Sequence, residues 1–216
     1  MNAIPPAAVV DVIGDSHVGD VARGEGLAPW LMQQFRANGW VPGRIVSKPG
    51  WSTAKYVREG NVTGIVRRAQ PAAVVLIVLG TNDAGYSAAQ YMADVRELGR
   101  QAGSAGAHVI WWGPPAVIRS AIAVGVSQAA DLQRQALQGT GIDWIDLRPP
   151  TPAGEFRDEV HLTPHGYSVL ASSAVEAMKG GASNITKYVL LGLGLAILAA
   201  LLWPPSAAPP PQPTVA

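Results

Sequence analysis

The sequence predicts an α/β domain, a three-layer α/β/α sandwich on a five-stranded parallel sheet, followed by one transmembrane helix near the C-terminus. Two observations predict the domain. Short apolar runs alternate with segments of helical periodicity, and the strongest apolar runs are unbroken and rich in β-branched residues. A third observation, a long uncharged apolar run late in the chain, predicts the membrane helix.

Short apolar runs mark the strands, which we predict at Ala7–Ile13, Arg44–Ser47, Ala72–Leu79, His108–Trp112 and Ile142–Leu147. The first and third runs are nearly unbroken, which is typical of strands covered on both faces in a parallel sheet. Helical patterns lie between and after the runs, at Ala28–Asn38, Thr53–Ala69, Ala88–Ala102, Ser127–Gln138 and Gly166–Lys179. Several of these patterns end near a glycine, as helices often do. The alternation predicts a single domain over residues 1–181.

The composition changes after this domain. We expect residues 182–187 to form a short linker, and residues 188–203 carry no charged or strongly polar side chain. With the residues just before it, this run approaches the roughly 20 residues that a helix needs to cross a bilayer. Residues 204–216 are rich in proline and are expected to be an extended or disordered tail. A buried core helix is the alternative interpretation of the apolar run.

The flanking charges predict the orientation of this membrane helix. Lys179 and Lys187 precede the apolar run and no charge follows it, so the positive-inside tendency places the domain on the cytoplasmic side. No cleavable signal peptide is expected, because the N-terminus lacks a basic region and prolines interrupt its apolar stretch. The pattern fits a single-pass anchor in a cellular membrane and equally one in a virion membrane.

The overall composition excludes several classes of function. The net charge is +1 and the basic residues are scattered, so we expect no nucleic-acid partner. The chain has no cysteine, which excludes disulfides, thiolate catalysis and cysteine-ligated metals. We expect neither a cofactor nor a metal.

Three predicted strands are each followed by a residue suited to catalysis. Ser16 in IGDSH follows the first, Gly50 in KPGWST the second and Asn82 in GTND the third. The carboxyl ends of strands in an open α/β sheet form its ligand-binding edge, so these residues share one rim. Taken singly, each has an ordinary alternative role as a helix cap or turn residue.

A fourth segment, DEVHLTPHGY, follows the last predicted strand and contains Asp158 and His161. A serine hydroxyl is a poor nucleophile until an imidazole takes its proton, and a carboxylate orients that imidazole. A capping or surface pair is the alternative. Only His165 is nearby as a second metal ligand, so a metal site is not expected. Together the four segments supply a nucleophile, a base, an orienting group and oxyanion donors.

These four blocks resemble, in order and approximate spacing, those of the SGNH (GDSL-like) hydrolases, over about the first 180 residues. The resemblance implies a flavodoxin-like α/β/α sandwich that cleaves or transfers acyl groups on esters. It implies that Ser16 is the nucleophile, His161 the base and Asp158 the residue that orients it. The oxyanion hole would comprise the N–H groups of Ser16 and Gly50 and the side chain of Asn82.

Other residues near this rim have weaker assignments. Trp51 and Trp112 are candidate substrate-binding residues that would stack on a sugar ring, and core packing is the alternative. His17 departs from the family, which often has leucine there. Asp15 is expected to cap the next helix or brace the nucleophile turn. His108 is expected only to pack at the start of its strand.

The sequence therefore predicts a membrane-anchored serine esterase or deacetylase that acts on O-acyl groups of a glycan, peptidoglycan or lipid. An acyltransferase with the same triad is one alternative. An inactive binding or structural module, displayed on a cellular or virion membrane, is another. The intact set of Ser16, Asn82, Asp158 and His161 favours an enzyme.

Overall fold

The computed structural model describes residues 4–20, 22–68 and 74–180. Its strands form one sheet in the order β2-β1-β3-β4-β5, and every neighbouring pair is parallel. The strands are β1 (Val9–Gly14), β2 (Val41–Ser47), β3 (Val74–Val78), β4 (His108–Trp112) and β5 (Asp143–Ile145). This confirms the predicted five-stranded parallel sheet.

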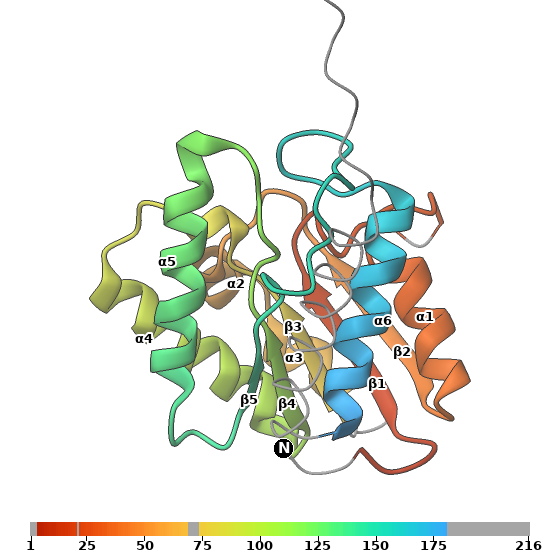
Figure 1. The fold of residues 1–216 in the computed structure, drawn as a ribbon. Helices are drawn as coiled ribbons and strands as arrows, with labels where there is room; N and C mark the ends of the chain where they lie inside the picture. The colour runs from red at the N-terminus through yellow and green to blue at the C-terminus, as the bar shows by residue number, and fades with distance from the viewer. Residues whose placement is uncertain (1–3, 21, 69–73, 181–216) are drawn as a thin grey trace, which may run out of the picture.

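Helices cover both faces of the sheet (Figure 1). On one face α1 (Ala28–Ala37) packs beside α6 (Pro164–Gly180). The helices of the other face are α2 (Thr53–Glu59), α3 (Val62–Arg68), α4 (Ala88–Ala102) and α5 (Ser120–Leu137). Two short 3-10 turns, η1 (Thr81–Asp83) and η2 (Gly103–Ala105), complete the connections. The fold is thus the predicted three-layer sandwich.

Each face of the sheet has its own apolar core, which explains the unbroken apolar strands. On β3, Leu76 lies in the core under α1 and α6, whereas Val75 and Ile77 lie in the core on the other face. Successive side chains of a strand point to opposite faces, so a strand covered on both faces needs apolar residues throughout.

The structure differs from the sequence prediction in two helical regions. The predicted helix Thr53–Ala69 is divided into α2 and α3 at Gly60 and Asn61. Asn61 has a φ of 45°, in the left-handed region, which an α-helix cannot accommodate. The helix predicted from Ser127 starts earlier, at Ser120, as α5.

Strand β2 also starts earlier than predicted, at Val41, although Pro42 and Gly43 follow. The ladder between β1 and β2 is irregular beside Asp11, whose Oδ1 accepts the Arg44 N–H at 2.7 Å. A buried carboxylate thus replaces a backbone acceptor at the irregularity.

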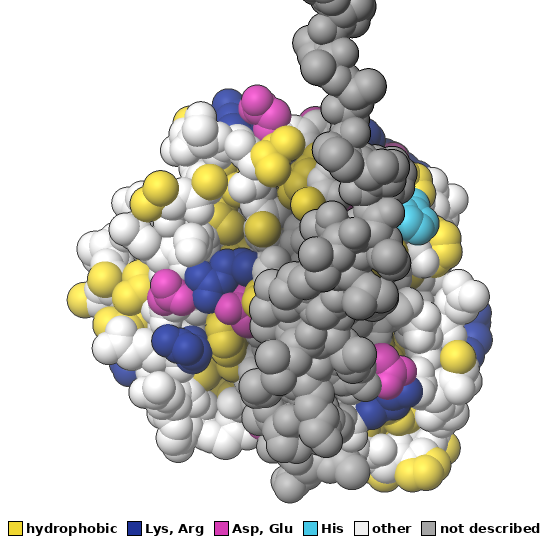
Figure 2. Space-filling view, in the orientation of Figure 1, with side chains coloured by type: hydrophobic (Ala, Val, Ile, Leu, Met, Phe, Trp, Pro, Cys, Tyr) yellow, Lys and Arg dark blue, Asp and Glu magenta, His cyan; other side chains and the backbone are white. Residues whose placement is uncertain are grey.

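The helices of the described residues are all too short or too polar to span a bilayer. The predicted linker 182–187, membrane helix 188–203 and tail 204–216 lie outside the described residues. On the described surface visible in Figure 2, cationic and anionic side chains lie next to each other with apolar side chains scattered among them.

Candidate active site

Ser16, His161 and Asp158 form one chain of polar contacts at the carboxyl edge of the sheet. His161 Nε2 lies 2.9 Å from Ser16 Oγ, and His161 Nδ1 lies 3.0 Å from Asp158 Oδ2. Ser16 directly follows β1, whereas the other two residues lie between β5 and α6, so the fold brings together segments 145 residues apart. This geometry allows the imidazole to take the serine proton while the carboxylate orients the ring.

Asp158 is held as a carboxylate by its own loop. Its Oδ1 accepts the backbone N–H groups of Val160 and His161, at 2.8 and 2.7 Å. Desolvation acts to raise the pKa of Asp158, but these backbone hydrogen bonds and that of the His161 ring outweigh it and hold the pKa below its usual range. Asp158 is therefore ionised at neutral pH and can stabilise an imidazolium.

The loop that carries this pair is fixed on both sides. Arg157 N–H donates to the His161 carbonyl at 2.8 Å, next to an antiparallel bridge between Phe156 and Leu162. From the segment before α5, Ile118 N–H donates to the Glu159 carbonyl at 3.0 Å. These contacts limit the backbone movement of His161 relative to Ser16.

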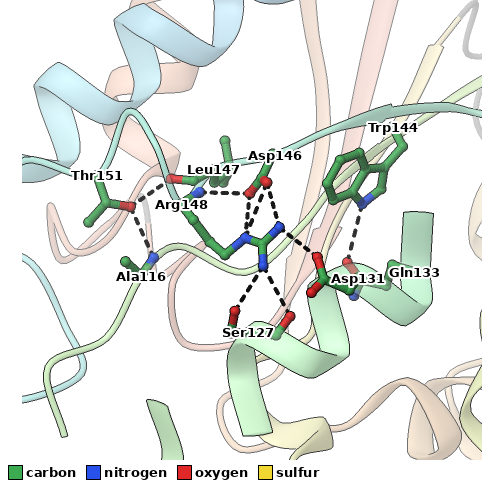
Figure 3. Close-up of polar contacts among 9 residues, drawn as sticks. All are labelled: Ala116, Ser127, Asp131, Gln133, Trp144, Asp146, Leu147, Arg148 and Thr151. Carbon is green, nitrogen blue, oxygen red and sulfur yellow. Dashed lines mark hydrogen bonds and ion pairs between the residues drawn. The ribbon is translucent and has the colours of Figure 1, made fainter. Parts of the chain in front are cut away.

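Arg148 fixes the start of the same loop (Figure 3). Its guanidinium contacts Asp146 and, on α5, Ser127 and Asp131, with Nη2 2.9 Å from the Asp131 carboxylate. Thr151 then accepts the Ala116 N–H at 3.0 Å. Since these contacts join β5, α5 and the loop, they define where the loop leaves the sheet.

Asp15 braces the turn that carries the serine, one of the two roles expected from the sequence. Its side chain is buried, and its Oδ1 accepts the His17 N–H at 2.9 Å. The Ser47 hydroxyl donates to the Asp15 carbonyl at 2.8 Å and so ties the turn to the end of β2. Burial raises the pKa of Asp15 to about 7, and the nearby Asp83 acts in the same direction.

Asn82, in η1, is connected to the serine turn through Asp15. Its Nδ2 donates to Asp15 Oδ2 at 3.2 Å and to the Trp51 carbonyl at 3.3 Å. Both amide hydrogens therefore have acceptors within the protein. A substrate oxyanion bound by Asn82 would take the place of one of them.

Gly50 lies in the exposed turn after β2, with a φ of 73° that favours glycine. A Cβ there would meet no atom within 4 Å, so the backbone faces open space. Its neighbour Pro49 lines the pocket beside Ser16, whereas Gly50 itself does not. The proposed N–H donor of Gly50 thus stays a prediction.

A pocket of about 790 Å³ opens beside Ser16 and His161. One wall comes from the segment between β1 and α1, with Asp20, Arg23 and Glu25. The remaining wall is mixed in character and includes Ile45, Ser47, Arg157 and Tyr167. Arg23 Nε lies 3.6 Å from Asp20 Oδ2, so the charges of this wall are partly paired. Charged and apolar side chains therefore both line this pocket.

The prediction that Trp112 binds substrate is wrong. Its side chain is fully buried in the core under α1 and α6, and Trp111 is fully buried on the other face. Both faces of β4 are covered, so neither indole reaches the rim.

Trp51 is half-buried and packs edge-on against Tyr56, with ring centroids 5.1 Å apart. The ammonium groups of Lys48 and Lys55 lie 5.6 and 4.9 Å from the centre of its ring. It does not line the pocket beside Ser16, so a role in substrate binding stays a prediction.

Sequence reasoning missed three contacts of histidine or tyrosine. His17 Nδ1 lies 3.1 Å from the hydroxyl of Tyr167, both side chains are buried, and the His17 ring lies next to that of His161. The only sequence signal for Tyr167 is its place in the first turns of the helix that follows His161. His108 does not merely pack: its Nε2 lies 2.7 Å from Asp143 Oδ2 on the neighbouring strand.

Comparison with solved structures shows the same fold in known esterases. A catalytic mutant of an acetylxylan esterase from Geobacillus stearothermophilus has a TM-score of 0.67 at 15% identity, covering 82% of this chain and 96% of that chain. A carbohydrate acetylesterase from Sinorhizobium meliloti has a TM-score of 0.63 at 13% identity, covering 78% and 97%. An aryl esterase from M. smegmatis has a TM-score of 0.64 at 16% identity, covering 79% and 97%.

Sequence comparison identifies the family. No curated protein matches the chain. The family model described as the GDSL-like lipase/acylhydrolase family matches residues 12–169, a segment that includes Ser16, Asn82, Asp158 and His161. This match covers well over half of the sequence, and the chain therefore belongs to the GDSL-like lipase/acylhydrolase family of SGNH serine ester hydrolases.

Proposed function

We propose that the protein removes small acyl groups, acetyl above all, from hydroxyl groups of a carbohydrate, through an acyl-enzyme on Ser16. The observation that carries this proposal is the continuous contact from Asp158 through His161 to Ser16, beside a pocket with charged side chains in one wall. The solved structures with a similar fold include a carbohydrate acetylesterase and an acetylxylan esterase, which supports the choice of acyl group and alcohol.

In the first half of the reaction, Ser16 Oγ attacks the ester carbonyl and its proton passes to His161 Nε2, 2.9 Å away. Asp158 stabilises the imidazolium that forms. When the tetrahedral intermediate collapses, the bond to the alcohol oxygen breaks and His161 returns the proton to this leaving group. The acyl group stays on Ser16.

In the second half, a water molecule attacks the acyl-enzyme, and His161 takes a proton from this water. The carboxylic acid leaves and Ser16 regains its proton. In both halves the carbonyl oxygen becomes negatively charged. The backbone N–H groups of Ser16 and Gly50 and the amide of Asn82 are the proposed donors to this oxygen.

The pocket lining favours short acyl chains. Charged side chains from Asp20 to Glu25 form one wall, and a long acyl chain beside them would desolvate these groups without replacing their hydrogen bonds. Acetyl is small enough to avoid this cost, and a sugar can satisfy polar groups with its own hydroxyls.

We expect kcat/KM to fall by at least about tenfold from p-nitrophenyl acetate to the octanoate, because the longer chain would desolvate the charged side chains of the pocket wall. Initial rates over the acetate, butyrate and octanoate series measure this. Acetylated xylo-oligosaccharide and a lysophospholipid should then be compared directly. A preference for octanoate and for the lysophospholipid would contradict a carbohydrate acetylesterase.

We also propose that residues 188–203 anchor the protein in a membrane, with the domain on the cytoplasmic side. The apolar run and the two preceding lysines support this. Tyr167, which lines the pocket, lies near the start of helix α6, and this helix runs to Gly180 near the opposite edge of the sheet (Figure 1).

Deleting residues 187–216 should release a soluble domain whose kcat/KM for p-nitrophenyl acetate stays within about twofold of the full chain, since the proposed catalytic groups all precede Gly181. Fractionation of cells expressing both forms measures the release. Full-length protein that is soluble without detergent would refute the anchor, and digestion of the domain by protease in intact spheroplasts would refute the cytoplasmic side.

A further inference from the structure

His17, next to Ser16 in the chain, lies against the ring of His161. Its side chain is only 1% exposed. The centres of the two imidazole rings are 5.3 Å apart, and their planes are tilted by 38°. The ring nitrogens of His161 face Asp158 and Ser16, so these two groups occupy its edge and leave the faces of the ring to other neighbours.

From this contact we propose that His17 is a positioning residue for the base, whose aromatic ring supports His161 and keeps it aligned with Ser16. The contacts at Nδ1 and Nε2 hold the two nitrogens of the His161 ring in place, but the ring can still rotate about the axis that joins these two atoms. A side chain packed against the ring limits this rocking. The proposal rests on the proposed function, in which His161 is the base.

His17 itself is held from three directions. Its backbone N–H donates to Asp15 Oδ1 at 2.9 Å, and its carbonyl accepts the Leu27 N–H at 2.9 Å. Its ring nitrogen Nδ1 is 3.1 Å from the hydroxyl of Tyr167, on α6. His17 therefore connects the serine turn to the helix that follows His161, and it can transmit the rigidity of both to the base.

The charge state of His17 is compatible with this role. Burial lowers the pKa of His17 to about 3, and the neighbouring His161 acts in the same direction, whereas Asp158 opposes it. His17 thus stays uncharged when His161 accepts the serine proton, and no second cation repels the imidazolium.

His17 also lowers the stability of the fold in one respect that an apolar residue would avoid. Among the described residues, no hydrogen-bond partner reaches the buried Nε2 of His17. A buried polar atom without a partner destabilises a fold, and such atoms in native proteins call for a functional explanation. An apolar side chain of similar size would remove this unpaired atom, but it would also take away the hydrogen bond to the Tyr167 hydroxyl. The stability of each variant at this position is therefore measured beside its rate.

In the full-length protein, His17→Leu should lower kcat for p-nitrophenyl acetate about fivefold and leave KM within about twofold, because a base that can rock is misaligned for proton transfer but does not hold the substrate. His17→Phe keeps an aromatic ring and should retain kcat within about twofold. Thermal melting establishes that each variant is folded, and His17→Met replaces the leucine variant if that one does not fold.

The control is His165→Leu, which removes an exposed histidine paired with Glu155 on the same side of the fold. Its kcat should equal that of the wild type. The proposal would be overturned if kcat fell equally in the leucine and phenylalanine variants or fell in neither. It would also be overturned if only KM changed, or if kcat fell as much in the His165→Leu control. The proposed function is tested separately. If the wild type hydrolyses the ester and Ser16→Ala does not, the proposed function holds whatever the His17 variants show.

Discussion

Replacing Ser16 with alanine should lower kcat for p-nitrophenyl acetate by about 10⁴-fold or more, because alanine has no hydroxyl to form the acyl-enzyme. The fold should be preserved. The Ser16 side chain is half-buried, and the substitution removes one oxygen and its contact with His161, with little loss of packing. Initial rates and thermal melting of both proteins measure the two parts of this prediction.

A matched control distinguishes loss of the nucleophile from a general effect of losing a serine. Ser172, on α6, also donates a side-chain hydrogen bond, at 2.9 Å to the Ser168 carbonyl, but it does not line the pocket. Ser172→Ala should keep the wild-type rate. A Ser16→Ala protein that hydrolyses the ester at close to the wild-type rate would rule out Ser16 as the nucleophile.

Removing the base should lower kcat nearly as much as removing the nucleophile. His161→Ala should lower kcat by about 10⁴-fold or more, since the Ser16 hydroxyl then has no group to accept its proton. Asp158→Ala should cost less, by about one to two orders of magnitude, because its side chain is 47% exposed and water can partly replace it as a partner of His161.

The double variant Ser16→Ala/His161→Ala separates a cooperating pair from two independent contributions. Residues that act as one unit show non-additive losses, so the double variant should be no slower than Ser16→Ala alone. Single-turnover rates at saturating substrate measure this comparison. Additive losses in the double variant would mean that His161 contributes to catalysis by a route that does not involve Ser16.

The positions of the strands and of the triad follow from patterns that the sequence displays. Segments that follow parallel strands share one rim, so Ser16, directly after β1, and His161, between β5 and α6, were expected at the same edge of the sheet. Their pairing as nucleophile and base came from the resemblance of the four sequence blocks. The break between α2 and α3 was missed. A helical pattern continues across Gly60 and Asn61, and only the positive φ of Asn61 reveals the turn.

Side-chain direction was harder to predict. Trp112 ends a predicted strand and was a candidate for substrate binding, but the adjacent residues Trp111 and Trp112 must point to opposite faces of the sheet. Since helices cover both faces of β4, both are in the core. The contact of His17 with Tyr167 joins residues 150 positions apart, and no local pattern in one sequence indicates it.

The most direct test of the central claim is to find the residue that a fluorophosphonate probe modifies, since such probes phosphonylate an activated serine. Mass spectrometry of the digested protein should find the adduct on the peptide that contains Ser16. Labelling should be absent from Ser16→Ala and should slow sharply in His161→Ala, because the base activates the hydroxyl. The account would be contradicted if the active esterase were labelled at another serine, or if His161→Ala were labelled as fast as the wild type.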